Sequence, residues 1–321
     1  MPSRPSNTAP WVARMRPLLG TLVEIRASGS SLRVADAVAA AFAAIERVQR
    51  LMSFHDERSD VSRINAVPVG REVTVDPDTY HVLRHARELG RGSDGAFDIA
   101  IAPALVSAGL LPSPPNGEHH PAPPSGTETL SGRFNDLELL PGHAVRWRKK
   151  GCIDLGGIAK GYAVDSAVAA LRSHRLAHGL VNAGGDLRCF GGPWPIHVRS
   201  VADPTALLAI GSLSDAAIAT SAGYFHRMQA GSRAVEPLVD PERGCCVAWD
   251  ASISVIAAQC MTADALTKVV RLAPASVAYM LDRYDAQAIV LDELGVRTWG
   301  RNRLSCDASS AKHLTAEAAT A

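Results

Sequence analysis

The order of hydrophobic patterns along the chain constrains the fold more than any other feature. Residues 20–28 alternate like a β-strand, and residues 31–54 form a long amphipathic helical pattern of Ala, Val, Ile and Leu. Further along the chain, single helical patterns continue to alternate with pairs of short strand patterns. This order favours an α+β fold, with mixed or antiparallel sheets packed against helices, over a doubly wound parallel sheet.

The remaining elements are predicted from the same patterns. Helices are expected at residues 77–89, 162–175, 262 to about 272, and 275–284. Short strands are expected at LELLP, AVRWRK, CIDLG, GLVNAG, DLRCFG, WPIHVRS, ISVIAA and QAIVLDE, with a turn at DPERG. We expect one domain over residues 15–305, a flexible segment at residues 1–14 and a frayed tail at residues 306–321.

Composition limits the classes of function. The 321 residues are 47% hydrophobic and 20% charged, which is sufficient for a large buried core. A formal net charge of +1 argues against a nucleic acid as the main partner. The N-terminal sequence MPSRPSNTAPWVARMRP lacks the apolar core of a signal peptide, and no segment reaches the ~18 apolar residues of a membrane span. We therefore expect a cytoplasmic protein with no membrane span.

Neither the cysteines nor the His119-His120 pair indicates a metal site. The six cysteines are scattered without a C-x-x-C motif, so reduced thiols are expected rather than a zinc site or a disulfide framework. Residues 112–126, PSPPNGEHHPAPPSG, contain six prolines and are predicted to form a surface loop. The His119-His120 pair in that loop is interpreted as solvated rather than as a metal site.

The segment IDLGGIAKGYAVD, which begins at Ile153, has the residues of a phosphate-binding turn. Gly156 and Gly157 allow the backbone to approach a bulky anion, and Lys160 supplies a cation next to a predicted helix N-terminus. Neither G-x-x-x-x-G-K-[ST] nor G-x-G-x-x-G is present. A strand–turn–helix junction, with glycines for packing and Lys160 in solvent, is the alternative.

The segment NAGGD returns the chain from this helix. Gly184 and Gly185 permit a tight bend, while Asn182 and Asp186 either fix nearby loops or line a nucleotide pocket. The structural role is favoured for these two polar residues.

Eight segments between residues 16 and 272 occur in the order typical of one protein family. They are RPLLGTLVEI, LMSFHDERSDVSRIN, DGAFDIAIAPAL, IDLGGIAKGYAVD, LVNAGGDLRCFG, AIATSAGYF, LVDPERG and SVIAAQCMTADALTKVV. In these segments the chain resembles the FAD:protein FMN transferases of the ApbE type. The resemblance implies a T-fold-like architecture, FAD as substrate, Mg²⁺ on its pyrophosphate, and an acceptor flavoprotein. A threonine hydroxyl of that acceptor attacks the FMN-side phosphorus, and AMP leaves.

The resemblance also implies which residues bind FAD. Leu19 keeps an apolar contact where the family has Met, and Phe54 stands where the family has an aromatic residue. Core packing is the alternative role for Phe54 and Phe97, and a strand end is the alternative for Thr220 and Ser221. The implied FAD-binding positions are Leu19, Phe54, Ala96, Phe97, Asp98, Asp154, Lys160, Thr220, Ser221 and Leu238.

The implied metal site combines the main-chain carbonyl of Gly157 with Asp264 and Thr267, because oxygen ligands suit Mg²⁺. Residues three and four positions after Asp264 lie on the same helical face, and these are Thr267 and Lys268. The family commonly has Thr at the fourth position. Lys268 therefore stands at a ligand position, where it either neutralises Asp264 or contacts phosphate, and both residues are assigned to catalysis.

The proton acceptor also departs from the family pattern. The family segment H-I-I-D-P-x-T-G reads PLVDPERG here, so Pro237 replaces the histidine that accepts the threonine proton. His226 is the candidate replacement, with a structural or solvated histidine as the alternative. Two other functions stay open: hydrolysis of FAD to FMN and AMP in the same pocket, and FAD binding without catalysis.

Overall fold

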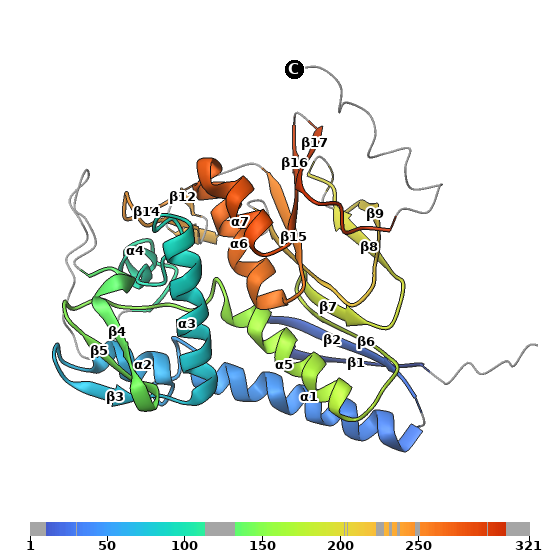
Figure 1. Cartoon of the computed structure of the whole chain (residues 1–321), viewed down its shortest axis with the longest axis horizontal. Coiled ribbons are helices and arrows are strands. Elements are labelled where there is room, and N and C mark those ends of the chain that lie inside the picture. The colour runs from blue at the N-terminus through green and yellow to red at the C-terminus, as the bar shows by residue number, and fades with distance from the viewer. Residues whose placement is uncertain are drawn as a thin grey trace, which may run out of the picture.

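An eight-stranded antiparallel sheet forms the centre of the molecule (Figure 1). The strand order is β1-β2-β6-β7-β10-β15-β16-β17, and every neighbouring pair in it is antiparallel, which confirms the predicted α+β class. The strands are β1 (Trp11–Leu18), β2 (Thr21–Ser28), β6 (His178–Ala183), β7 (Asp186–Phe190), β10 (Ala217–Ala222), β15 (Ser252–Ala257), β16 (Gln287–Asp292) and β17 (Gly295–Gly300). This computed structural model describes residues 11–29, 31–112, 132–201, 203, 205–222, 228–230, 233–235, 238–247, 251–293 and 295–305.

Three helices cover one face of the sheet. They are α1 (Ser31–Met52), α5 (Ala159–Ser173) and α6 (Cys260–Leu272); α5 packs between α1 and α6 (Figure 1). Alternation along β6 divides its side chains between two cores, because Val181 joins the helix-side core while Leu180 joins the core on the other face. The central strand β15 is buried along its whole length, as a strand covered on both faces must be.

A separate hairpin covers the opposite face. Strands β8 (Trp194–Arg199) and β9 (Leu207–Leu213) pair with each other, and Ile196, Val198 and Ile210 pack against the sheet in the second core. The sheet is therefore sandwiched between helices and a hairpin, which leaves the cavity described below on the helical side.

The remaining elements build a smaller part of the molecule around a three-stranded sheet in the order β3-β5-β4. They are β3 (Glu72–Thr74), β4 (Leu137–Leu140), β5 (Ala144–Trp147), α2 (Asp60–Ala66), α3 (Pro77–Gly92) and α4 (Ala102–Ser107). Helix α7 (Val277–Arg283) follows α6, and four short strands complete the fold: β11 (Met228–Ala230), β12 (Arg233–Val235), β13 (Val239–Asp240) and β14 (Cys245–Cys246).

The predicted flexible segment at residues 1–14 is wrong over residues 11–14, which belong to β1. This strand forms a hairpin with β2 through Leu19 and Gly20, both of which have positive φ, at 56° and 70°. The pattern failed because β1 lies at the sheet edge, where six of its eight residues are exposed and Pro17 is tolerated. An exposed edge strand has no alternation to detect.

The predicted strand at CIDLG is also wrong. The backbone of this segment makes its hydrogen bonds outside a sheet. The Asn65 side chain accepts a hydrogen bond from Ile153 N at 2.8 Å and donates one to Ile153 O at 2.9 Å. Asp154 N donates to Ile99 O at 2.8 Å. At Ile153 and Asp154, a side chain and a loop carbonyl thus take the place of a neighbouring strand.

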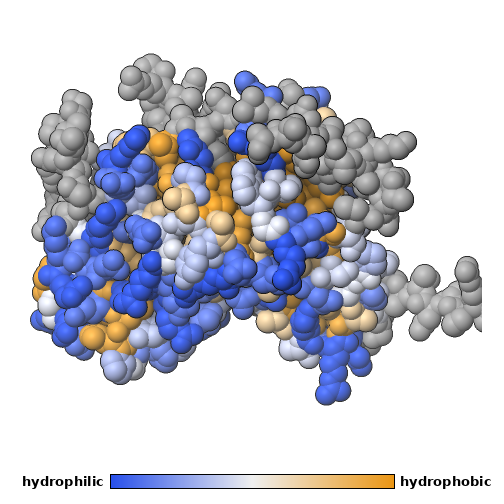
Figure 2. Space-filling view, turned by 45° about the horizontal axis from the view of Figure 1, so that its top comes forward, coloured by the Kyte–Doolittle hydropathy of each residue, from blue (hydrophilic) through white to orange (hydrophobic). Residues whose placement is uncertain are grey.

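The other predicted helices and strands are confirmed, with ends shifted by up to three residues. Most of the Pro-rich loop, residues 1–10 and residues 306–321 lie outside the described residues. The five cysteines that are described form no disulfide. None of the helices in the described part of the chain combines the length and apolar character needed to cross a bilayer. Hydrophilic side chains cover much of the face shown in Figure 2.

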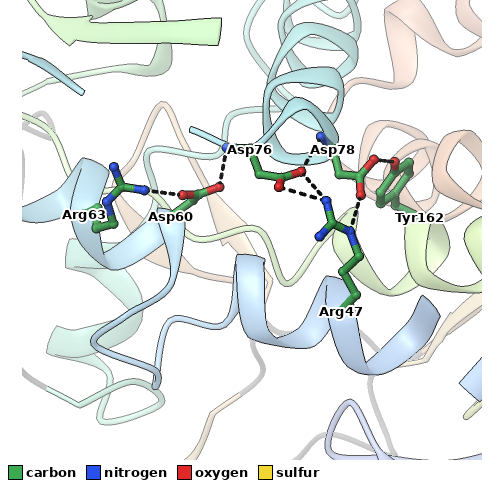
Figure 3. A network of polar contacts seen from close by, with 6 residues as sticks. All are labelled: Arg47, Asp60, Arg63, Asp76, Asp78 and Tyr162. Carbon is green, nitrogen blue, oxygen red and sulfur yellow. Dashed lines mark hydrogen bonds and ion pairs between the residues drawn. The ribbon is translucent and has the colours of Figure 1, made fainter. Parts of the chain in front are cut away.

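A polar network ties the four helices α1, α2, α3 and α5 together (Figure 3). Arg47 on α1 donates to Asp76 at 2.8 Å and to Asp78 at 3.0 Å, at the N-terminus of α3. The Tyr162 hydroxyl on α5 donates to Asp78 at 2.8 Å, and Asp76 N donates to Asp60 of α2 at 2.8 Å. The network fixes the first turn of α5 relative to α1 and α3.

Replacing Asp76 separates its two roles. Its carboxylate caps α3 by accepting from Asp78 N at 3.0 Å, and it also pairs with Arg47. We expect Asp76→Ala to lower the free energy of unfolding by about 1–2 kcal/mol, because it removes both interactions. Asp76→Asn keeps a capping oxygen and should lose less than about 1 kcal/mol. Urea unfolding measures both, and equal losses would contradict separate cap and ion-pair contributions.

We expect stability to depend on pH through a partly buried histidine between α3 and α6. His85 Nε2 lies 3.0 Å from the Thr262 hydroxyl, and burial lowers the His85 pKa to about 4. In the unfolded chain, a histidine has a pKa of about 6.5, so His85 becomes protonated there at a higher pH than in the folded protein. The free energy of unfolding therefore falls as the pH drops from about 6.5 to about 4.

Within that pH window, the contribution of His85 lowers the free energy of unfolding by up to ~1.4 kcal/mol for each pH unit. His85→Gln keeps a hydrogen-bonding group for Thr262 but does not titrate, so its stability should fall less steeply. Urea unfolding at several pH values between 7 and 4 compares the two proteins. Parallel curves would show that His85 is not responsible.

Candidate functional site

A cavity of about 630 Å³ opens where the main sheet and helices meet the smaller part of the molecule. Its walls come from the end of α1, the β1–β2 turn, the segments 96–101 and 154–160, the end of β10 and helix α6. All ten predicted FAD-binding positions line it: Leu19, Phe54, Ala96, Phe97, Asp98, Asp154, Lys160, Thr220, Ser221 and Leu238. The structure thus brings together residues that are up to 219 positions apart in the chain, from Leu19 to Leu238.

Many of the side chains that line the cavity are apolar. Phe54 and Phe97 contribute aromatic rings, and residues on and after α4, together with Leu238 and Val239, add aliphatic side chains. Phe97 is only 5% exposed, so it belongs to the core as well as to the cavity wall. Such a surface suits a flat, largely apolar ring system.

The cavity lining also includes two lysines, each paired with a buried aspartate. The Lys160 ammonium lies 2.8 Å from Asp186 Oδ2; the side chains are 32% and 3% exposed, respectively. The negative charge of Asp186, with a smaller contribution from Asp264, raises the pKa of Lys160. Lys160 therefore stays charged in the cavity wall, where Asp186 holds it. Asn182 has a different role, because its side chain accepts a hydrogen bond from Gly185 N at 3.0 Å and so closes the turn.

The second lysine lies one helical turn from its aspartate. The Lys268 ammonium contacts Asp264 Oδ1 and donates to the Asp264 carbonyl oxygen at 3.0 Å. Gly161 N donates to the other carboxylate oxygen, Oδ2, at 3.2 Å. Asp264 is almost fully buried, and it does not line the cavity, whereas Lys268 does. The ammonium, rather than the carboxylate, is presented to a ligand.

Hydroxyl groups from β10 and α6 complete this wall. Ser221 Oγ lies 2.8 Å from Thr267 Oγ1, which in turn donates to the Asp264 carbonyl oxygen at 2.7 Å. Thr220 Oγ1 lies 2.8 Å from Ser254 Oγ on β15. These bonds fix the positions of the hydroxyls before any ligand enters.

Two further carboxylates line the cavity in different environments. Asp98 accepts from Ala100 N at 2.7 Å and from Phe134 N at 3.2 Å, so it organises its own loop. Asp154 accepts from Gly156 N at 2.9 Å. Burial raises the pKa of both carboxyls, and the charge of nearby His55 partly opposes this effect at Asp154.

The predicted magnesium site does not fit the arrangement of its donors. Lys268 and Gly161 N already donate hydrogen bonds to the two carboxylate oxygens of Asp264. The Thr267 hydroxyl is already hydrogen-bonded to Ser221 Oγ and to the Asp264 carbonyl oxygen. In the described ranges, no three His, Cys, Asp or Glu side chains gather closely enough to hold a metal ion. A dication at Asp264 would have to displace the Lys268 ammonium, so Gly157, Asp264 and Thr267 lie together without offering a free carboxylate.

The sequence analysis did not identify some residues that line the cavity, and two residues that it discussed lie outside the described part of the chain. His55 follows Phe54 directly in the motif LMSFHDERSD, and this adjacency was the available signal. Gln49 accepts from Leu19 N at 2.7 Å and so positions the β1–β2 turn, which no sequence pattern indicated. His226 and Pro237 lie outside the described residues.

Helices α5 and α6 meet at a glycine, which brings the two lysines to one wall. A Cβ on Gly161 would collide with the Cys260 carbonyl oxygen, so only glycine permits this approach. Asp165 on α5 accepts from Cys260 N and Met261 N, both at 2.9 Å, and thereby caps α6.

Two glycine substitutions test this contact. We expect Gly161→Ala to lower the free energy of unfolding by about 1–3 kcal/mol through overpacking, although helix propensity alone favours alanine. Gly157→Ala is the matched control, because its Cβ meets only the Lys268 Cε, at 3.4 Å, and should change stability by less than about 1 kcal/mol. Chemical unfolding provides the comparison. A Gly161→Ala protein as stable as the control would rule out this close approach.

Comparisons with known proteins identify relatives of this chain. The model of the ApbE family matches residues 19–290. A Vibrio cholerae protein named FAD:protein FMN transferase is 28% identical over 234 residues, which are 69% of each chain. A Rhodobacter capsulatus protein of the same name is 27% identical over 269 residues, which cover 80% of this chain but 50% of that relative. The match therefore spans about half the length of the Rhodobacter relative.

Solved structures show the same fold. The ApbE protein of Thermotoga maritima superposes with a TM-score of 0.74 at 27% identity, covering 90% of this chain and 97% of its own. The apo form of a Pseudomonas stutzeri flavinyl transferase ApbE gives a TM-score of 0.74 at 21% identity, covering 98% and 100%. The second likeness concerns the fold alone.

Proposed function

The chain belongs to the ApbE family, and on that premise we propose that it transfers FMN from FAD to a threonine hydroxyl of an acceptor flavoprotein, releasing AMP. The observation that carries the proposal is the lining of the cavity, which combines apolar and aromatic side chains with two ammonium groups held by ion pairs. An aromatic ring system joined to a pyrophosphate matches both kinds of group. The names of the Vibrio and Rhodobacter relatives support the same reaction.

The apolar side chains of the cavity would hold the flavin ring of FAD, with Phe54 and Leu238 beside it. The pyrophosphate would lie against Lys160 and Lys268, whose positions are fixed before binding by Asp186 and Asp264. Fixed cations next to a phosphate stabilise the charge that develops during phosphoryl transfer, because they need no reorganisation.

In the proposed reaction, the acceptor hydroxyl oxygen forms a bond to the FMN-side phosphorus. The bond from that phosphorus to the bridging oxygen breaks, and AMP leaves with the bridging oxygen. The hydroxyl proton passes to a base, for which His226 is the proposed residue. Lys160 and Lys268 neutralise the leaving oxygen and the phosphoryl oxygens. Magnesium is the ion that the family resemblance implies, but no step here depends on it.

The test combines two measurements on one reaction mixture. Purified protein is incubated with FAD and a candidate flavoprotein acceptor, with an acceptor Thr→Val variant as matched control. We expect AMP release in step with a gain of one FMN in the mass of the threonine-bearing acceptor only. AMP without a mass gain would indicate hydrolysis, and bound FAD without AMP would indicate a binding protein.

A Lys160→Met variant should bind FAD about 10- to 100-fold more weakly, because it loses a charge-assisted hydrogen bond to phosphate. Lys149→Met is the matched control, since Lys149 is exposed and lies outside the cavity. Fluorescence titration with FAD measures both. Equal affinities for the two variants would remove Lys160 from the binding site.

A further inference from the structure

We infer that the Lys268 ammonium replaces a divalent cation in this chain, so that the cavity holds the pyrophosphate of its dinucleotide without a metal ion. The inference rests on the proposed function for the identity of the ligand as FAD. It concerns which group carries the positive charge at the phosphate, and it predicts a metal independence that the family resemblance does not imply.

Both oxygens of the Asp264 carboxylate already have partners. Lys268 contacts Oδ1, and Gly161 N donates to Oδ2 at 3.2 Å. The Asp264 side chain is 2% exposed, so its charge needs a fixed partner. A dication bound there would push the ammonium away from the carboxylate that it contacts. The two cations compete for one carboxylate.

Both lysine side chains are more exposed than the aspartates that hold them. The lysine side chains are 20% and 32% exposed for Lys268 and Lys160, while their aspartates are 2% and 3% exposed. An ammonium has three N–H donors, and the described contacts of Lys268 use two, to Asp264 Oδ1 and to the Asp264 carbonyl oxygen. One donor of Lys268 remains for a ligand oxygen.

The Thr267 hydroxyl, which the family resemblance assigns to the metal, already makes two hydrogen bonds within the protein. Thr267 Oγ1 donates to the Asp264 carbonyl oxygen and pairs with Ser221 Oγ. It stands three residues after Asp264, while Lys268 stands four residues after it, within reach of the carboxylate. The position that reaches the carboxylate therefore carries a cation instead of an oxygen ligand.

The deciding measurement uses the wild-type protein. FAD affinity is measured by flavin fluorescence in EDTA and again with excess Mg²⁺. We expect the two dissociation constants to agree within about threefold, because the fixed ammonium groups already supply the charge. Binding that is tighter in Mg²⁺ by more than this would overturn the inference, as would an absence of FAD binding under both conditions.

Variants at Lys268 sharpen the test. Lys268→Thr frees Asp264 and adds an oxygen ligand, so its FAD affinity should fall about 10- to 100-fold in EDTA and recover with Mg²⁺. Lys268→Met should fall similarly and recover less, because methionine offers no oxygen. Lys149→Thr is the control for the loss of a positive charge and should match wild type in both buffers. A Lys268→Thr protein that binds FAD in EDTA as tightly as wild type would contradict the inference.

Circular dichroism establishes that each variant is folded, and the wild-type comparison decides the question even where a variant is not. AMP and acceptor mass are measured in the same samples. FAD bound equally with and without Mg²⁺ but never cleaved would support the inference while removing the transferase function. Cleavage and transfer that require Mg²⁺ would support the function and overturn the inference.

Discussion

The contact between helices α5 and α6 is the constraint on which the rest of the site depends. Gly161 lets the two helices touch at the Cys260 carbonyl, and Gly161 N then reaches the Asp264 carboxylate at 3.2 Å. Asp165 closes the same junction by capping the first turn of α6. Because α5 carries Lys160 and α6 carries Lys268, this one packing contact brings both ammonium groups to a single wall.

Burial of the aspartates explains why the lysines can act as fixed charges. A carboxylate that is 2–3% exposed is unfavourable unless it is paired, so Asp186 and Asp264 hold their lysines in place in the absence of a ligand. The lysines remain partly exposed and face the cavity that apolar side chains also line. The site is therefore organised before binding, and the electrostatic work of holding an anion falls to residues that already have defined positions.

The sequence predicted the longer helices, most strands of the main sheet and part of the cavity wall, for different reasons, but not the short helices α2 and α4. Periodicity identified α1, α3, α5 and α6 because each buries one continuous face. The ordered motifs identified Lys160 and Lys268, which lie 108 positions apart in the chain. Neither source could find the exposed edge strand β1, the side-chain bonds of Asn65 that replace a strand at CIDLG, or the pairing of Lys160 with Asp186. Each of these depends on a tertiary partner that local sequence does not specify.

The most direct test of the account is a structure of the protein with FAD, crystallised in a buffer that contains EDTA. The account predicts pyrophosphate oxygens within ~3 Å of the Nζ atoms of Lys160 and Lys268, with Lys268 still on Asp264 and no ion between them. A pyrophosphate bound elsewhere in the cavity, or Lys268 turned away from both Asp264 and the ligand, would contradict it.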